Sequence, residues 1–285
     1  MTWPQQEPET AADDDLWFLP GSSEDSVQGD MPWPVAPREP HIAPTSWRDA
    51  EAGVYRDLIR AAETLARYRE AMRGAPVDLS ERFALMTVSA ILRDEGVWIS
   101  PEQISLYRNL RTGADRETRD LARGAWALRR LLRPDPGLFA DLRGFLGRID
   151  VQDPQPALVD RPVGPEIDRL GQGLNRDTTL LSDCHVLTRA GFAFARWRAE
   201  GVTPWDELLE PTIAVLCLAS EGVPPGLPMV AGHRLDRHAA EARSGSAEAR
   251  LAIFYAAIEA GALSGLMELD RVKRWHDAAG RAVAH

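Results

Sequence analysis

The sequence contains little lysine and cysteine, and it has no long apolar run. Lys273 is the only lysine. Because arginine replaces lysine along the whole chain, genome composition explains this bias better than dedicated phosphate contacts do. The two cysteines, Cys184 and Cys217, imply no disulfide framework. Uninterrupted apolar runs such as Ile213–Ala219 are far shorter than the ~20 residues of a membrane helix. The N-terminus also lacks a secretory signal pattern, so we expect a cytoplasmic protein with no membrane segment.

Sequence patterns for metal, cofactor and nucleophile sites are also missing. There is no HExxH, no paired CxxC and no Walker A loop, and no GxGxxG follows a strand. His233 and His238 are five residues apart, which does not place two ligands on one helical face. Cys184 adjoins His185 within a helical pattern, a poor setting for a nucleophile. Gly171-Gln172-Gly173 has no third glycine and is interpreted as a turn. We therefore predict no metal and no cofactor, and we favour a non-enzymatic function.

Negative charge is concentrated at the N-terminus. The formal net charge of the chain is −10, and residues 1–45 contain nine acidic residues and one arginine. The same segment holds eight prolines and the run Asp13-Asp14-Asp15, without a helical period. Such a segment cannot bury enough apolar surface to offset the entropy cost of ordering. We predict a disordered acidic tail over 1–45 that precedes a nearly neutral body.

One short apolar patch interrupts this tail. Leu16, Trp17, Phe18 and Leu19 follow the three aspartates and precede further acidic residues. Bulky apolar side chains among acidic ones are typical of peptide motifs that dock in the groove of a protein partner. In the alternative interpretation, the patch folds back on the protein's own surface.

The remainder of the sequence shows helical periodicity and no strand alternation longer than four residues. Spacings of three and four, together with capping residues, predict helices over 46–72, 79–95, 101–110, 115–132, 136–149 and 178–200. A further helix opens at Thr203-Pro204 with a kink or break at Pro211, and a last helical region after Ser246 is divided near Gly261, Ser264 and Gly265. The prediction is an all-α, irregular multi-helix bundle. Four prolines at 150–165 indicate a linker between helical subdomains at 46–149 and 166–285.

The helices at 79–110 have the approximate length of a helix-turn-helix. The second helix carries Gln103, Arg108 and Asn109, with Arg111 just beyond it. These side chains can contact bases or phosphates, so a DNA-binding regulator is the alternative function. An ordinary helical hairpin with a solvated polar face explains the same pattern. In the arginine-rich helix at 115–132, acidic neighbours offset the positive charge and predict another solvated face.

Three segments resemble a family of uncharacterised alphaproteobacterial proteins, often plasmid-borne. Ile91–Ile104 looks like one segment of that family, Arg119–Arg130 is similar to its following helix, and Ala249–Arg271 resembles its late helix pair. The likeness is patchy over about residues 46–282, and its motifs are short. It implies a helical region that is distantly Fic-like, followed in the family by a C-terminal helix-turn-helix.

The sequence departs from this family in two ways. The family's helix-turn-helix follows the equivalent of Arg271, whereas this sequence ends at His285. The Fic motif requires a histidine base and a glycine-rich anion loop, and the corresponding junction Trp197–Trp205 has neither. The resemblance therefore implies a catalytically dead Fic-like domain. Our leading expectation is a helical interaction or regulatory protein, associated with a mobile element, that engages a protein partner through its acidic tail.

Overall fold

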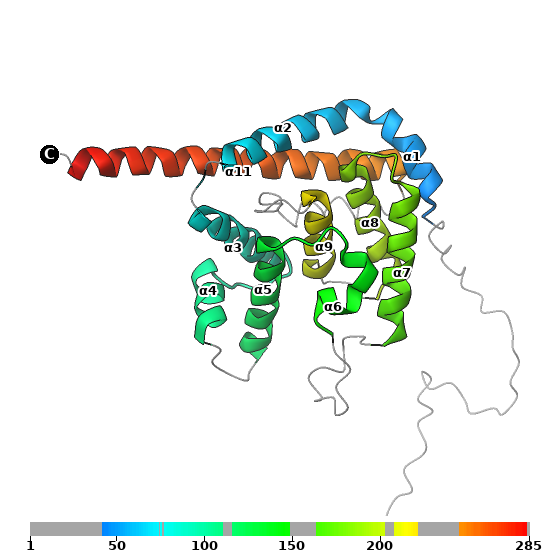
Figure 1. The fold of residues 1–285 in the computed structure, drawn as a ribbon, viewed down its shortest axis with the longest axis horizontal. Coiled ribbons are helices and arrows are strands. Elements are labelled where there is room, and N and C mark those ends of the chain that lie inside the picture. The colour runs from blue at the N-terminus through cyan, green and yellow to red at the C-terminus, as the bar shows by residue number, and fades with distance from the viewer. Residues whose placement is uncertain are drawn as a thin grey trace, which may run out of the picture. The chain divides into compact units, whose positions relative to one another are not determined.

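The computed structural model describes residues 42–73, 75, 77–110, 116–148, 164–202, 208–221 and 245–283. The helices of these ranges are α1 (Pro44–Gly53), α2 (Tyr55–Arg73), α3 (Val77–Asp94), α4 (Pro101–Leu110), α5 (Arg116–Leu132), the 3-10 helix η1 (Leu138–Asp141), α6 (Leu142–Leu146), α7 (Pro165–Leu180), α8 (Val186–Glu200), α9 (Leu209–Ser220) and α11 (Ala247–Val283) (Figure 1). The described ranges contain no strand. The predicted all-α, multi-helix fold is confirmed.

Buried side chains from both predicted subdomains belong to one hydrophobic core. In one contact across the predicted division, the rings of Trp47 and Phe192 meet edge to face with centroids 5.6 Å apart. All the described residues belong to one compact unit. The packing therefore shows no break between 46–149 and 166–285. Most of the predicted linker and nearly all of the predicted tail lie outside the described residues.

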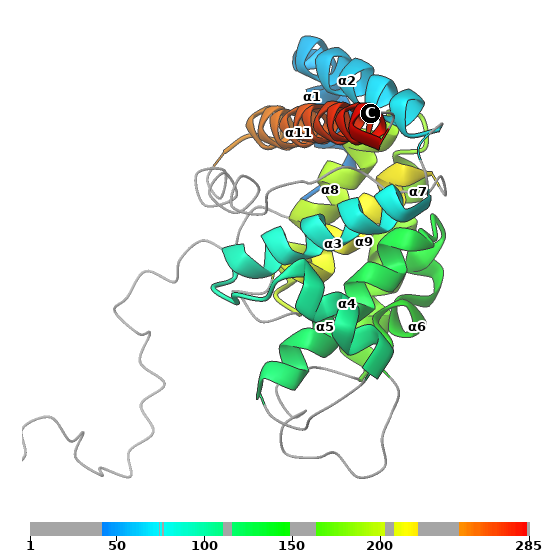
Figure 2. The ribbon, with the colours of Figure 1, turned by 90° about the vertical axis from the view of Figure 1, so that its left-hand side faces the viewer.

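The longest helix pair consists of α2 and α11, which run side by side in the same direction (Figure 1). Near their N-terminal ends, a Cβ added to Gly53 would lie 3.3 Å from the Glu248 side chain. Farther along, Arg82, at the start of α3, bonds to Glu268 of α11. Buried residues follow spacings of three and four on both helices: Leu58, Ala61, Leu65, Tyr68 and Met72 on α2, and Leu251, Tyr255, Ile258, Ala262, Gly265 and Leu269 on α11. Such spacing aligns one stripe per helix. Figure 2 shows α1, α2 and α11 on one side of the other helices.

The boundaries of these two helices differ from the prediction. The predicted helix 46–72 is two helices that meet at Val54, whose N–H bonds to the Ala50 carbonyl. The predicted division of the last helical region is wrong, because α11 is continuous over 37 residues. Gly261 and Gly265 lie on its buried side, and the Ser264 hydroxyl bonds to its own helix at Ala260. Small residues here permit close packing and do not end the helix.

The sequence prediction missed α7. Pro165, which we assigned to the linker, occupies the first turn of this helix, where a missing N–H costs little. The turn predicted at Gly171-Gln172-Gly173 is wrong, because these residues lie inside α7. A Cβ on Gly171 would lie 2.9 Å from Leu142 Cβ, so this glycine permits close approach of α7 to α6. The predicted helix 178–200 is shorter than expected and corresponds to α8.

Two other helix predictions are corrected. Instead of one helix over 136–149, the chain forms η1 and α6, and Gly147 ends α6 at φ 69°. No kink occurs at Pro211, because α9 begins at Leu209 and places this proline in its first turn. The helix start that we expected at Thr203-Pro204 lies outside the described residues.

By length and composition, α11 is the one helix in the described ranges that could cross a membrane. Of its most apolar stretch, 44% is buried inside the protein. Because α11 packs along α2, a core helix accounts for this composition. The cytoplasmic location stays a prediction.

Candidate protein-interaction surface

The structure places some of the proposed nucleic-acid residues in structural contacts. Gln103 closes the predicted capping box: its side-chain oxygen accepts from the Ser100 N–H at 2.8 Å, and its own N–H donates to the Ser100 hydroxyl at 3.2 Å. Arg108 forms an ion pair with Glu81 of α3 at 2.9 Å. The side chain of Asn109 and the whole of Arg111 lie outside the described residues. The partner-binding prediction for Leu16, Trp17, Phe18 and Leu19 also falls outside them.

A buried arginine on α5 joins three helices. Arg123 pairs with Glu95 at 2.6 Å and with Asp120 at 3.2 Å. The other oxygen of Glu95 accepts the N–H groups of Leu208 and Leu209 at 2.6 and 2.7 Å, at the start of α9. Burial raises the pKa of Glu95, and Arg123 and the two N–H groups oppose that rise. At Arg123, our prediction of a solvated face on α5 is therefore wrong.

A second buried ion pair holds the same end of α9. Arg148, after α6, bonds to Glu210 in the first turn of α9 at 2.5 Å. Both side chains are almost fully buried. Two buried carboxylates thus stabilise the start of α9: Glu95 accepts two of its N–H groups, and Glu210 pairs with Arg148. These charges hold helices together, and neither faces a groove that the structure describes.

The cysteine–histidine neighbours do not form a nucleophile and base. Burial raises the pKa of Cys184, which disfavours the reactive thiolate. His185 caps α8, where its Nδ1 accepts the Leu187 N–H at 3.1 Å, and burial lowers its pKa. Nearby, the Glu51 carboxylate accepts hydrogen bonds from the backbone N–H of His185 at 2.9 Å and from the Thr188 hydroxyl. This polar cluster fastens α1 to α8. In the parts of the chain that the structure describes, no group of three potential metal ligands occurs.

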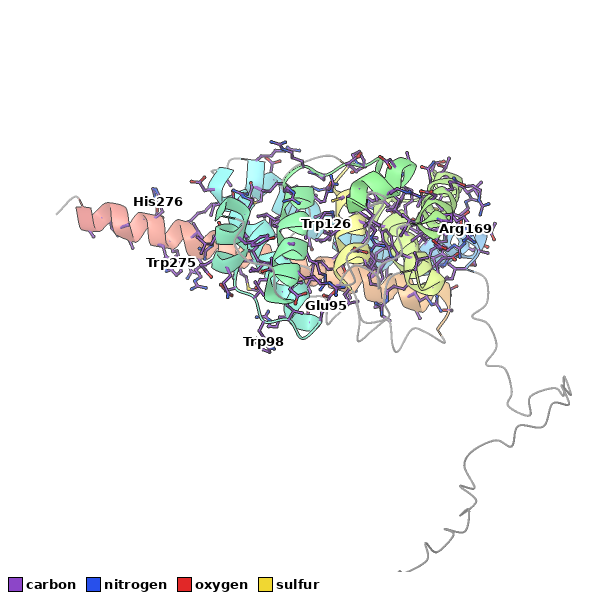
Figure 3. All side chains as sticks on the ribbon, turned by 90° about the horizontal axis from the view of Figure 1, so that it is seen from below. Glu95, Trp98, Trp126, Arg169, Trp275 and His276 are labelled. Atoms are coloured by element: carbon purple, nitrogen blue, oxygen red, sulfur yellow. The ribbon has the colours of Figure 1, made fainter. Side chains whose placement is uncertain are left out.

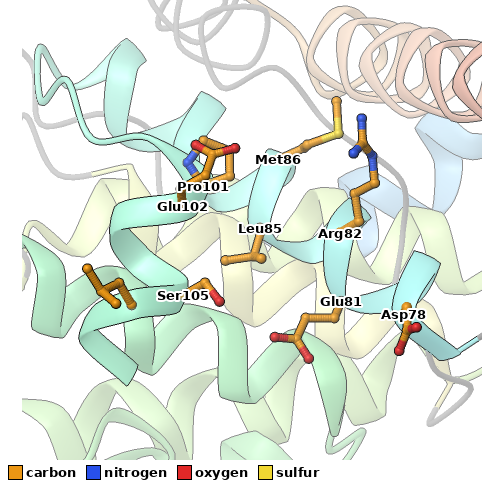
Figure 4. Close-up of a pocket in the computed structure, with 9 residues that line it drawn as sticks. Asp78, Glu81, Arg82, Leu85, Met86, Pro101, Glu102 and Ser105 are labelled. Atoms are coloured by element: carbon orange, nitrogen blue, oxygen red, sulfur yellow. The ribbon is translucent and has the colours of Figure 1, made fainter. Parts of the chain in front are cut away.

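An open groove of about 780 Å³ lies between α3 and α4 (Figure 4). It is lined by Asp78, Glu81, Arg82, Leu85, Met86, Pro101, Glu102, Ser105 and Leu106. Leu106 is 59% exposed. Three acidic residues and one arginine give the lining a net charge of −2. Hydrogen bonds to its own backbone N–H and to Ser100 lower the pKa of Glu102, so this carboxylate is ionised at neutral pH.

The groove opens beside α11. Arg82 and Met86 extend from α3 toward α11, and Arg82 bonds to Glu268 at 3.1 Å (Figure 4). Beyond this contact, α11 continues past the end of α2 (Figure 1). We call residues 270–283 the overhang. From Asp270 to Ala282, every side chain of the overhang is exposed except half-buried Val272.

An exposed apolar row follows α11 onto the overhang. We define the α11 row as Leu263, Met267, Arg271 and Trp275, which are spaced four residues apart and so lie on one side of the helix. Met267 is 66% and Trp275 is 52% exposed, and the Arg271 guanidinium stacks 4.4 Å from the centre of the Trp275 ring. Figure 3 shows Trp275 on the projecting part of α11.

Large exposed apolar side chains concentrate in this region. The described residues include seven of them: Tyr55, Trp98, Leu106, Leu180, Leu263, Met267 and Trp275. Five of these belong to the α3–α4 pair with its connecting turn, or to the α11 row. Trp98, in that turn, points outward from the body (Figure 3). Contiguous exposed apolar side chains with a polar rim are typical of interaction sites.

A second groove, of about 650 Å³, lies between α7 and α8. Its arginines have acidic neighbours: Arg169 pairs with Glu166, and Arg176 and Arg196 both pair with Asp177. The groove therefore offers no unneutralised arginine cluster for an anion. The groove between α3 and α4 is the stronger candidate.

No family model matches the chain, and neither the curated proteins nor the solved structures contain a match. The resemblance to the plasmid-borne, distantly Fic-like family therefore stays a prediction.

Sequence reasoning did not select the groove or the α11 row. The spacing of four from Leu263 to Trp275 was a usable signal for the row, because it lies apart from the stripe that α11 buries. The groove had no such signal. Its lining comes from two helices whose relative placement depends on tertiary packing.

Proposed function

We propose that this protein is a non-enzymatic interaction protein that binds an amphipathic helix of a protein partner. The binding surface consists of the groove between α3 and α4 and the adjacent α11 row. One observation carries the proposal: four of the seven large exposed apolar side chains among the described residues lie on this surface, namely Leu106, Leu263, Met267 and Trp275, and a fifth, Trp98, lies in the turn that connects α3 and α4. An amphipathic helix would place its apolar face on Leu106 and Met86, and basic side chains at its edge would meet the acidic groove rim.

The contacts of α4 do not favour DNA binding. Base or phosphate contact would require Arg108 to leave Glu81 and Gln103 to leave the cap of its own helix. The groove beside them is negatively charged, and phosphate backbones are repelled by such a surface. The acidic tail with Leu16–Leu19 stays a prediction as an additional partner-binding segment.

Site-specific photocrosslinking tests the proposal. A photoreactive benzoylphenylalanine is placed at position 106, at position 267 or, as a control, at position 180. Leu180 is 54% exposed, close to the value for Leu106, but lies on α7 away from the groove. We expect adducts from positions 106 and 267 in cells that express the chain naturally, and none from position 180. If all three positions react equally, or none reacts, the proposed surface is wrong.

A further inference from the structure

We infer that the partner is a second copy of this chain: the overhang of each copy docks in the groove between α3 and α4 of the other. This inference rests on the proposed function and names the partner of the same surface. Both halves of the contact are present on one chain, so two copies can exchange them reciprocally. A twofold axis then makes the same contact twice and doubles the buried area.

Charge complementarity supports this occupant. The overhang carries four basic and two acidic side chains, a net charge of +2. The groove lining has a net charge of −2. On the groove side, Glu81 and Arg82 already have partners in Arg108 and Glu268, so Asp78 and Glu102 remain to attract the overhang. The opposite charges of the two surfaces favour their encounter and fix its orientation.

The apolar surfaces and lengths also fit. The overhang is a helix of 14 residues, about 21 Å long at 1.5 Å per residue. The ten residues of α4, which form one wall of the groove, extend about 15 Å. In the proposed complex, Trp275 of one copy covers Leu106 of the other, and each side chain loses its exposed apolar surface.

The surface is also continuous with an established packing interface. Leu269, just before the overhang, is 3% exposed and is the last buried residue of the α11 stripe among the described residues. Val272 and Ala279 lie three and ten positions after Leu269, on the same side of the helix and beyond α2. The apolar stripe of α11 therefore extends beyond α2, the helix that covers it within the same chain. A second copy would supply the missing cover.

Charge exchange tests the inference. The groove variant carries Asp78→Lys and Glu102→Lys, and the overhang variant carries Lys273→Glu and Arg281→Glu. A matched control, Asp49→Lys with Glu63→Lys, reverses two exposed acids on α1 and α2. Sedimentation velocity measures the mass of each protein and of equimolar mixtures at about 1 to 100 µM. Circular dichroism and thermal unfolding verify that each variant is folded.

We expect the wild type and the control to form dimers, and each charge-reversed variant to dissociate about tenfold more readily or more. An equimolar mixture of the two variants should dimerise again. In that mixed dimer the basic groove meets an acidic overhang and the acidic groove meets a basic overhang. Restoration by mixing cannot arise from misfolding of either variant.

Three results would overturn the inference: a wild type that stays monomeric over the whole concentration range, a dimer whose dissociation neither pair of charge reversals changes, or a mixture of the two variants that fails to restore the dimer. Cosedimentation with anionic phospholipid vesicles is measured in parallel. If the chain does not dimerise but binds the vesicles, and Lys273→Glu with Arg281→Glu abolishes that binding, the overhang is a membrane-binding segment. This result also overturns the inference. If the chain is monomeric but positions 106 and 267 crosslink another protein, self-docking fails and the proposed function stands.

Discussion

Replacement of Glu95 should destabilise the fold through two separate losses. In Glu95→Gln, the retained oxygen can still accept the N–H groups of Leu208 and Leu209, but an amide NH2 replaces the oxygen that faces Arg123. Breaking one side of a buried ion pair costs about 3 to 5 kcal/mol. Because Asp120 still contacts Arg123 at 3.2 Å, we expect the lower end, about 3 kcal/mol.

Glu95→Ala should cost more than Glu95→Gln. Alanine also leaves the two N–H groups at the start of α9 without their acceptor, at about 1 to 3 kcal/mol for each buried donor. Urea unfolding followed by circular dichroism measures both variants. A loss below about 1 kcal/mol in Glu95→Gln would show that the pair with Arg123 does not hold these helices together.

The stability difference between the wild type and Glu95→Gln should change with pH in a defined direction. Burial raises the pKa of Glu95 above its ordinary value of 4.5, so between 4.5 and the raised pKa the folded state binds more protons than the unfolded state. The free energy of unfolding then falls as pH rises through this interval. Glu95→Gln lacks this titration. The stability advantage of the wild type over Glu95→Gln should therefore shrink as pH rises from 4.5, and an advantage that grows would contradict the assignment.

Three further predictions concern single positions. Burial lowers the pKa of His185 below 6.5, so the wild type should lose stability as pH falls through 6.5. His185→Asn should retain the helix cap without this loss of stability. His185→Ala, which removes the cap, should cost about 1 kcal/mol of stability in a thermal melt. Gly171→Ala should destabilise by about 1 to 3 kcal/mol in urea because its Cβ would lie 2.9 Å from Leu142 Cβ, whereas Gly280→Ala, with no atom within 4 Å, should be neutral or stabilising. Burial raises the pKa of Cys217 from 9.0 to about 12, so its thiol should react with a disulfide reagent about a thousandfold more slowly than a free thiol until urea unfolds the protein.

The sequence predicts those helices whose buried stripes follow a regular spacing. Leu58 through Met72 repeat at three and four residues, so the buried side of α2 could be identified before the structure was known. The capping box at Ser100 and Gln103 was equally readable, because both partners lie within four residues of each other. In these cases the determining interactions are local.

Glycine and proline caused most of the errors because their effect depends on the surroundings. Gly171 looks like a turn in sequence, but in the fold it permits close packing of α7 against α6. Pro165 looks like part of a linker, but it begins a helix. Gly261 and Gly265 look like helix breaks, but they lie on the buried side of a continuous helix. The sequence alone does not give the neighbour that makes each residue suitable.

The interior charges could not have been predicted either. Glu95 and Leu208 are separated by 113 positions, and Arg148 and Glu210 by 62, so no local pattern connects them. The groove has the same limitation, because two separate helices form it. The α11 row could have been recognised from its spacing in the sequence, but its position beside the groove could not.

Chemical crosslinking between two copies tests the central claim most directly. Leu106→Cys and Trp275→Cys are made separately, with Cys184 and Cys217 retained because both are buried. The two variants are mixed and treated with a short bismaleimide, and Leu180→Cys replaces Leu106→Cys in the control mixture. The account predicts a covalent product of twice 31.5 kDa from the first mixture and little from the control. Equal yields from the two mixtures, or no product from either, would contradict it.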